Sequence, residues 1–411
     1  SFMKQTSYFA SGSAASSLRF TTDRDDMLRQ VNAQSNISVP TSPTILSSDF
    51  RLPKTWKSSL SLDAKLPGDI DFSFEGLLSR DINPVVVSNG DIYWDGTSTI
   101  DLGHGDVRHQ LSYYDPQHAP YILENAGGKA YYISLTAGLL KSFPFGLTIA
   151  GSYTKSWAKS YTEGVGNQVT SAYNNYRASV NAVNDNETGY STYVAPDRVL
   201  LSLSYKMRTS KHSNSIISLI YDGYQYGFLT NFGFNRYSYT FTNCVNGDPT
   251  APGNLIYIPA SREELQTWNF KDNGTVDGQT YTADMQRDDF WSYIEQDPYL
   301  SKHKGQYAER GGAKMPWHHQ LDFKFTQEFH IDWGKTTHTL QLGMDILNLP
   351  NFLCKDWGVF KQITGSDLLN YDKGQYTYNL QNGKRHLTTY QNFIVAVSTY
   401  QIMFTIRYLF N

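Results

Sequence analysis

The chain has 411 residues and a formal net charge of −3, with a mean hydropathy of −0.47. This near-neutral charge balance gives no reason to expect a nucleic acid as partner. No run approaches the roughly 20 consecutive apolar residues of a spanning helix, which excludes a helical membrane protein. The length suits two or three soluble domains or one large β-barrel.

Residues 1–50 are polar, rich in Ser and Thr, and show no sustained periodicity. We expect a loop region here, with a short helix near residues 23–33. From Trp56 onward, apolar and polar residues alternate in nine stretches, which is typical of strands with one wet face. Eight of these stretches form four hairpins with short turns, and the ninth stands alone: 56–66 with 70–79, 131–139 with 147–154, 199–207 with 215–227, 321–329 with 340–346, and 400–411.

The last stretch has the clearest pattern. One face of the predicted strand is entirely apolar, with a ring at each end, and the other face is mixed and contains Arg407. In a membrane barrel such a face meets lipid, and its terminal aromatic residues lie at the two interfaces. The predicted lipid-facing residues are Tyr400, Ile402, Phe404, Ile406, Tyr408 and Phe410.

Short turns alternate with long connections at about 81–128, 162–195, 229–315 and 349–395. Several loops longer than about 15 residues count against a compact soluble domain. Outer-membrane barrels have short periplasmic turns and long extracellular loops. The pattern therefore predicts an all-β, antiparallel transmembrane β-barrel in the outer membrane of a Gram-negative bacterium. Residues 51–411 form the barrel segment, and 1–50 form an extracellular loop region. A secreted β-sandwich is the alternative.

Nine strands is an odd number, whereas bacterial single-chain barrels normally have an even one. An open sheet edge in lipid leaves backbone groups without hydrogen bonds. We therefore expect the chain to be the C-terminal part of a larger barrel, although a strand hidden within residues 1–50 would change the count.

Four stretches resemble a known family: 254–261 (NLIYIPAS), 293–329 (including QYAERGGAKMPWHHQLDF), 340–358 (LQLGMDILNLPNFLCKDWG) and 405–410 (TIRYLF). They are similar to the C-terminal barrel of TonB-dependent outer-membrane receptors, in the Oar-like branch with a carboxypeptidase-regulatory-like domain, related to SusC-type transporters. The resemblance implies a 22-stranded barrel closed by a plug. This chain would be its last nine strands. Thr405 departs from the family, which prefers Gly at that position of the assembly signal, and so does Asn411, which follows the final aromatic.

The resemblance also implies function and partners. A nutrient would cross the membrane when the TonB complex pulls on an N-terminal box that, like the plug, we expect to lie upstream. Membrane lipid and a surface lipoprotein lid would be further partners. A non-transporting barrel that anchors or binds in a surface complex is the alternative function.

Aromatic runs in the long connections supply candidate substrate contacts. Tyr and amide side chains stack on sugars and peptides and form hydrogen bonds with them. The runs YNNY and YDGYQY give four candidate residues, although aromatic membrane girdles would produce the same enrichment. The candidates are Tyr173, Tyr176, Tyr224 and Tyr226.

Other motifs predict no chemistry. His104, Asp106 and His109 could ligate a metal, but loop polarity explains them equally. The oxygen-rich segment 243–254 leaves calcium open without matching an EF-hand. Cys244 and Cys354 fall on the same side of the membrane, either as a disulfide or as two thiols. Nothing resembles an activated nucleophile, so we expect no enzyme, no catalytic residue and no cofactor.

The segment 317–319 (Trp-His-His) stands at the start of a predicted strand. Trp and His at that level are more typical of an interface belt than of a binding site. We therefore expect these residues to anchor the barrel in the membrane.

Overall fold

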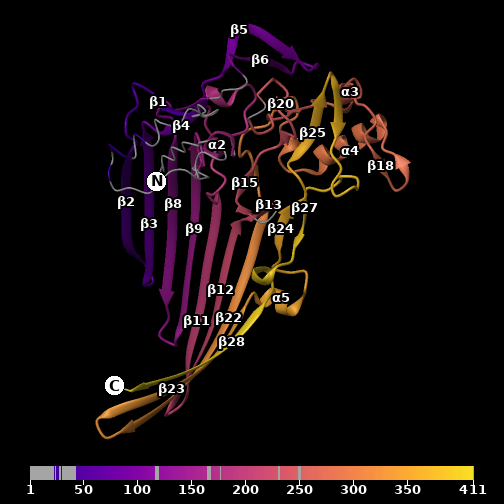
Figure 1. Ribbon diagram of the computed structural model, residues 1–411. Helices are drawn as coiled ribbons and strands as arrows, with labels where there is room; N and C mark the ends of the chain where they lie inside the picture. Colours follow the sequence, from indigo (N-terminus) through magenta and orange to yellow (C-terminus); the bar gives the residue numbers. More distant parts are fainter. Residues whose placement is uncertain are drawn as a thin grey trace.

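The computed structural model describes residues 23, 25–26, 29, 43–115, 120–163, 168–175, 177–229, 232–248 and 251–410. The predicted loop up to residue 42 and the helix near 23–33 lie outside these ranges apart from four residues. Nine long antiparallel strands form one sheet, each beside its neighbour in sequence (Figure 1). They are β2 (Lys54–Leu66), β3 (Ile70–Ile82), β8 (Tyr131–Ser142), β9 (Leu147–Ser160), β11 (Asp197–Ser210), β12 (Ser213–Gln225), β22 (Trp317–Trp333), β23 (Thr336–Leu347) and β28 (Gln401–Phe410).

This nine-stranded sheet, which we call the wall, confirms the predicted strands. Most strands extend beyond their predicted bounds, because polar residues at the ends still pair through the backbone. β22, for example, begins at Trp317 and ends at Trp333, where the alternation predicted 321–329. A short strand, β10 (Gly189–Tyr190), also pairs with the end of β9. Within the described residues, β2 and β28 each pair with one neighbour only.

The register aligns the apolar residues of all nine strands on one face of the wall. On β28, for example, Phe404 faces Met344 of β23. In its middle, this face carries no charged residue among the described positions. Lys155 and Asp197, which form an ion pair at 2.5 Å, lie toward the end with the long connections. One rung crosses six strands: Phe72, Leu139, Gly151, Leu201, Tyr221 and Leu321.

Aromatic side chains lie at both ends of this apolar face. At the end with the long connections they are Trp56, Tyr131, Trp157, Trp317 and Tyr400, and at the turn end they are Phe145, Tyr205, Trp333, Tyr408 and Phe410. Membrane barrels carry such girdles at their two interfaces. The wall therefore has the charge-free band and the two aromatic belts that a bilayer requires.

The four long connections and residues 43–53 fold together at one end of the wall, and we call this part the canopy (Figure 1). It contains the helices α2 (Val169–Asn174), α3 (Arg262–Gln266), α4 (Ala283–Gln296) and α5 (Leu349–Leu353), and short 3-10 turns at 183–185, 300–302 and 396–398. Among the described residues, no helix is long and apolar enough to cross a bilayer.

Short strands in the canopy form several small sheets. These are β1 (Thr44–Leu46) with β7 (Tyr121–Asn125) and β4 (Val85–Asn89); β5 (Ile92–Asp101) with β6 (Val107–Tyr113); β14 (Phe232–Phe234), β13 (Gly227–Leu229), β24 (Phe360–Ile363) and β27 (Tyr390–Phe393); β16 (Thr240–Phe241), β25 (Asp367–Asp372) and β26 (Gln375–Tyr378); and three two-stranded pairs, β15 (Arg236–Tyr237) with β21 (Ala313–Lys314), β17 (Tyr257–Ile258) with β20 (Gln306–Tyr307), and β18 (Thr275–Val276) with β19 (Gln279–Thr280).

The hydrophobic core lies in the canopy and not in the wall. Of the buried hydrophobic side chains in the described residues, only Ile346 belongs to a strand of the wall. The largest cluster surrounds α4, where Phe290, Tyr293 and Ile294 pack with residues such as Trp268 and Tyr378. The side chain of Thr282 caps α4 by accepting a hydrogen bond from the backbone N–H of Met285.

A fully buried carboxylate, Asp297, joins the segments of this core. It accepts hydrogen bonds from the hydroxyls of Tyr239 at 2.6 Å and Thr389 at 2.9 Å. The backbone N–H groups of Tyr299 and Leu300 donate to its other oxygen. Because a buried charge is costly unless hydrogen-bonded, these four donors are what allow Asp297 to sit there.

Phe404→Arg tests the orientation of the wall. Arg in the middle of the apolar stripe of β28 should destabilise the assembled protein by roughly 2–4 kcal/mol. Thr405→Arg, one residue further on the opposite face, is the control and should assemble normally. The folded fraction is measured by heat-dependent gel migration and by unfolding in vesicles. Equal losses in the two variants would contradict the orientation.

Asp297→Asn tests whether the hydrogen bonds of Asp297 stabilise the canopy core. An amide cannot accept all four hydrogen bonds, so we expect a loss of about 1–3 kcal/mol in canopy stability. Hydrogen exchange of the α4 amides measures it. Asp288→Asn, which removes only an exposed ion pair with Arg262, is the control. Unchanged protection of α4 in Asp297→Asn would refute the role of Asp297.

Candidate functional site

The second face of the wall is polar and consists largely of hydroxyl groups and paired charges. Thr136 and Thr154 lie in hydrogen-bond contact at 2.9 Å, and Ser204 contacts Ser218 at 3.0 Å. Four ion pairs bridge between strands: Lys65–Asp71 at 3.6 Å, Arg198–Asp222 at 2.7 Å, Lys206–Glu328 at 3.5 Å and Lys324–Asp345 at 3.1 Å. Exposed pairs add little stability. Here the four ion pairs keep the polar face of the wall accessible to water and nearly balanced in charge.

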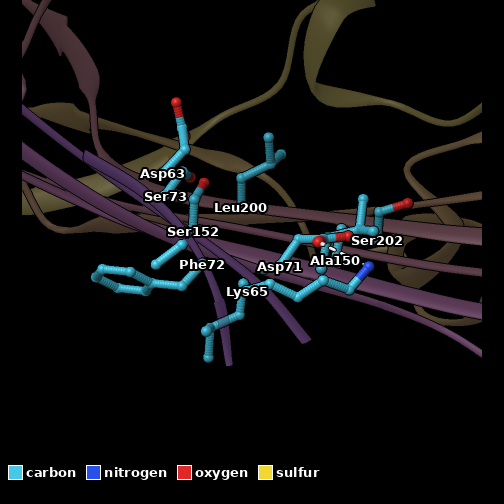
Figure 2. Close-up of a pocket in the computed structure, with 14 residues that line it drawn as sticks. Asp63, Lys65, Asp71, Phe72, Ser73, Ala150, Ser152, Leu200 and Ser202 are labelled. Atoms are coloured by element: carbon cyan, nitrogen blue, oxygen red, sulfur yellow. Dashed lines mark ion pairs between the residues drawn. The ribbon is translucent and has the colours of Figure 1, made fainter. Parts of the chain in front are cut away.

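A hollow of about 520 Å³, the polar-face hollow, lies on this surface across β2, β3, β8, β9 and β11 (Figure 2). It adjoins the turn between β2 and β3 and, on β11, the first half of the strand. Small residues, among them Gly138 and Ala150, form its floor. A Cβ at Gly138 would lie 2.8 Å from the hydroxyl of Ser73, so a larger residue at this position would force the Ser73 side chain to move. The ion pair of Lys65 and Asp71 stands at its rim.

Two leucines interrupt the polar character of this hollow. Leu140 and Leu200 point to the polar face, and each is 40% exposed. Such a surface can contact a molecule that has both apolar and polar groups. The alternation of apolar and polar residues does not predict the hollow. The hollow could have been predicted from the two places where a strand has two consecutive apolar residues, Leu139–Leu140 and Leu200–Leu201.

Tyr224 and Tyr226, two of the predicted substrate contacts, lie where the wall meets the canopy. Both are half-buried. Tyr224 is on the polar face, with the guanidinium of Arg198 5.7 Å from its ring centre. Tyr226 packs edge-on against Phe228 and Phe360 at 5.5 and 5.6 Å. The aromatic cluster therefore joins β12 to the canopy, and only Tyr224 also borders the polar face.

Tyr173 and Tyr176, the other two predicted contacts, do not join them. Tyr173 is fully buried, and its hydroxyl donates to Asp248 at 2.6 Å. Burial raises its pKa far above the usual range. A direct contact between Tyr173 and a substrate would require the canopy to open. Tyr176 lies outside the described residues.

The histidine motif at 104–109 does not converge on a common point. Asp106 binds the buried Arg108 through two contacts, at 2.7 and 2.9 Å. His104 contacts the hydroxyl of Thr267, and His109 stacks on Trp94 at 3.6 Å. No group of three His, Cys, Asp or Glu side chains in the described part of the chain is placed to hold a metal ion.

The oxygen-rich segment 243–254 uses its amides to connect canopy segments. The amide of Asn243 exchanges hydrogen bonds with the backbone of Tyr371, and Asn254 accepts from the backbone N–H of Val245. Residues 249–250 lie outside the described ranges, so calcium in this segment stays a prediction. Cys244 and Cys354 are both free thiols. Burial raises the pKa of the Cys244 thiol.

The Trp-His-His segment divides between the two faces of the wall. Trp317 and His319 stack on the apolar face, and His319 contacts the hydroxyl of Tyr221 at 2.7 Å. His318 is nearly buried and stacks on Phe360 at 3.8 Å. Trp317 and His319 thus stand at the level predicted for the interface belt, while His318 fixes the canopy to the wall.

Comparison with known proteins agrees with this architecture. A family model described as an outer membrane beta barrel domain matches residues 2–353, which include every long strand except β28. No curated protein and no solved structure matches the chain. The amphipathic wall, its two aromatic belts and this match agree with one another: the chain belongs to the outer membrane beta barrel domain family and resides in the outer membrane.

Proposed function

We propose that this chain forms the wall and outer entrance of a TonB-dependent transporter that admits a nutrient across the outer membrane. The observation that carries the proposal is the polar face of the wall, which combines hydroxyl groups and paired charges with the polar-face hollow. A polar interior is common to outer-membrane barrels, whereas a hollow that combines leucines with hydroxyl groups also offers contacts for a nutrient. The resemblance of the segments at 254–261 and 293–329 to TonB-dependent receptors supports this function.

The arrangement of the chain supports a direction for transport. Long loops of outer-membrane barrels face the outside and short turns face the periplasm. On this rule the canopy stands at the cell surface, and the polar-face hollow adjoins the periplasmic ends of β2 and β3. A nutrient would contact the canopy first, pass the junction at Tyr224, and then follow the polar face.

The work of transport would come from outside these residues. In the proposed assembly a plug occupies the interior and TonB displaces it, as in the family that the sequence resembles. Additional strands of the same barrel would pair with β2 and β28, because open edges are not tolerated in lipid. We propose that residues of this chain bind and guide the nutrient, and that none of them performs a reaction on it.

A second function, a surface platform, rests on a different observation. The canopy has its own large core around α4, with Trp268, Tyr293 and Tyr378 fully enclosed. Such a rigid body could support a surface lipoprotein or another complex without any transport. Two results together would favour this function: co-purification of a surface complex with the protein from the wild-type strain, and intact nutrient uptake in a strain that lacks the gene.

The transporter is tested by deleting the gene and growing the strain on single carbon sources, both oligosaccharides and peptides. We expect a growth defect on at least one source, and the same defect in a strain that lacks TonB. Normal growth of the deletion strain on every source that requires TonB would refute the proposal.

Ser202→Trp tests the polar-face hollow within that experiment. The indole would fill the hollow, and we expect uptake of the identified nutrient to fall at least tenfold, equivalent to about 1.4 kcal/mol. Met207→Trp, on the apolar face of the same strand, should leave uptake unchanged. Surface labelling confirms equal amounts of both variants. Normal uptake by Ser202→Trp would show that the nutrient does not pass the hollow.

A further inference from the structure

The apolar face of the wall carries a groove that a smooth lipid-facing surface does not require. This apolar-face groove has a volume of about 850 Å³ and runs across β3, β8, β9, β11 and β12. Its lining includes Phe72, Leu139, Leu201 and Tyr221, with Lys141 and Phe143 toward the turn end. Apart from its turn end, where Lys141 stands, the groove lies within the charge-free band.

Two small side chains make the surface concave. Ala137 and Gly151 occupy outward-facing positions where most neighbouring residues are large. Leu201 leans over Gly151, so that a Cβ at Gly151 would lie 2.9 Å from a methyl group of Leu201. The larger residues therefore form the sides of the groove, and the small ones form its floor. An extended hydrocarbon chain lying there would contact protein on several sides, which increases its dispersion contacts over those on a flat wall.

One cation stands at the turn end of the groove. Lys141 points to the same face as Leu139, and its Nζ donates a hydrogen bond to the carbonyl of Gly68 in the β2–β3 turn. The Nζ lies 5.3 Å from the ring centre of Phe143. Lys65, on the opposite face, pairs with Asp71, whereas Lys141 has no carboxylate partner among the described residues. Its charge is therefore free to attract an external anion.

We propose that the apolar-face groove is a binding site for one glycerophospholipid, with an acyl chain in the groove and the phosphate at Lys141. The phosphate and the ammonium group can form a charge-assisted hydrogen bond at the interface. The turn end faces the periplasm, so the lipid belongs to the periplasmic leaflet. The groove continues the lipid-contacting face of the wall, which favours a lipid over a protein as its occupant.

A general interfacial role for Lys141 predicts something different. Lysines near the ends of membrane segments extend toward the headgroups and contact many lipids in turn. A specific site instead binds one lipid with saturation, and depends on the shape of the groove and on the charge of Lys141 together. The two cases separate when shape and charge are changed independently.

The experiment titrates the assembled protein, purified from the outer membrane in detergent, with two probes and counts bound lipid by native mass spectrometry. The probes are 1-palmitoyl-2-oleoyl-phosphatidylglycerol and the diacylglycerol with the same chains. For the wild type we expect one saturable phospholipid. Ala137→Phe, which fills the groove, should lower the affinity for both probes at least tenfold. Lys141→Gln should lower it several-fold for the phospholipid alone.

Matched controls place the same changes outside the groove. Ser58→Phe adds a ring to the apolar face of β2, and Lys335→Gln removes a lysine from the β22–β23 turn; both should bind like the wild type. Unsaturable binding, or equal effects of Lys141→Gln and Lys335→Gln, would overturn the proposal. Lys141→Gln alters only a side chain at the membrane interface, so it remains decisive if Ala137→Phe fails to assemble. Retention of a protein in the groove instead of a lipid would also refute it.

Discussion

Backbone hydrogen bonding determines how the strands of the wall are arranged. Inside a bilayer no water can satisfy an N–H or C=O group, so each strand of the wall must pair with its neighbours. Pairing fixes the register, and register fixes the face on which each side chain lies. A shift of one residue between β11 and β12 would carry Leu201 and Leu203 to the polar face. The apolar band and the polar face are thus two results of one pattern of hydrogen bonds.

The same constraint explains why the packed core lies outside the wall. A sheet with lipid on one side and water on the other cannot bury its side chains in itself. The canopy, at the end of the wall, is free to fold around α4 as soluble proteins do, and it uses buried partners such as Asp297 and Tyr239. At one place, around Gly138, Ala150 and Gly151, the wall is thin, because the polar-face hollow and the apolar-face groove lie on its two sides.

The sequence was sufficient to predict the wall, because few structures besides a β-strand maintain a period of two over a whole segment. The alternation predicted nine strands and the apolar stripe from Tyr400 to Phe410. It did not predict the residues at most strand ends, because their polarity hides the alternation. The canopy could not be predicted in the same way. Its strands are mostly two to six residues long, and they pair across large separations, as Thr240 does with Asp367. Burial of Tyr173 depends on Asp248, 75 residues away, and no local pattern contains that information.

The wall separates lipid from water, and labels on adjacent residues of one strand can detect this separation. Spin labels are attached to single cysteines at Leu201, Ser202, Leu203 and Ser204 of β11, with Cys244 and Cys354 replaced by serine. Collision rates with oxygen and with a water-soluble nickel chelate are then measured in vesicles. Labels at 201 and 203 should collide mainly with oxygen, and labels at 202 and 204 mainly with nickel. Equal collision rates along the strand, or the opposite alternation, would contradict the assignment of the two faces.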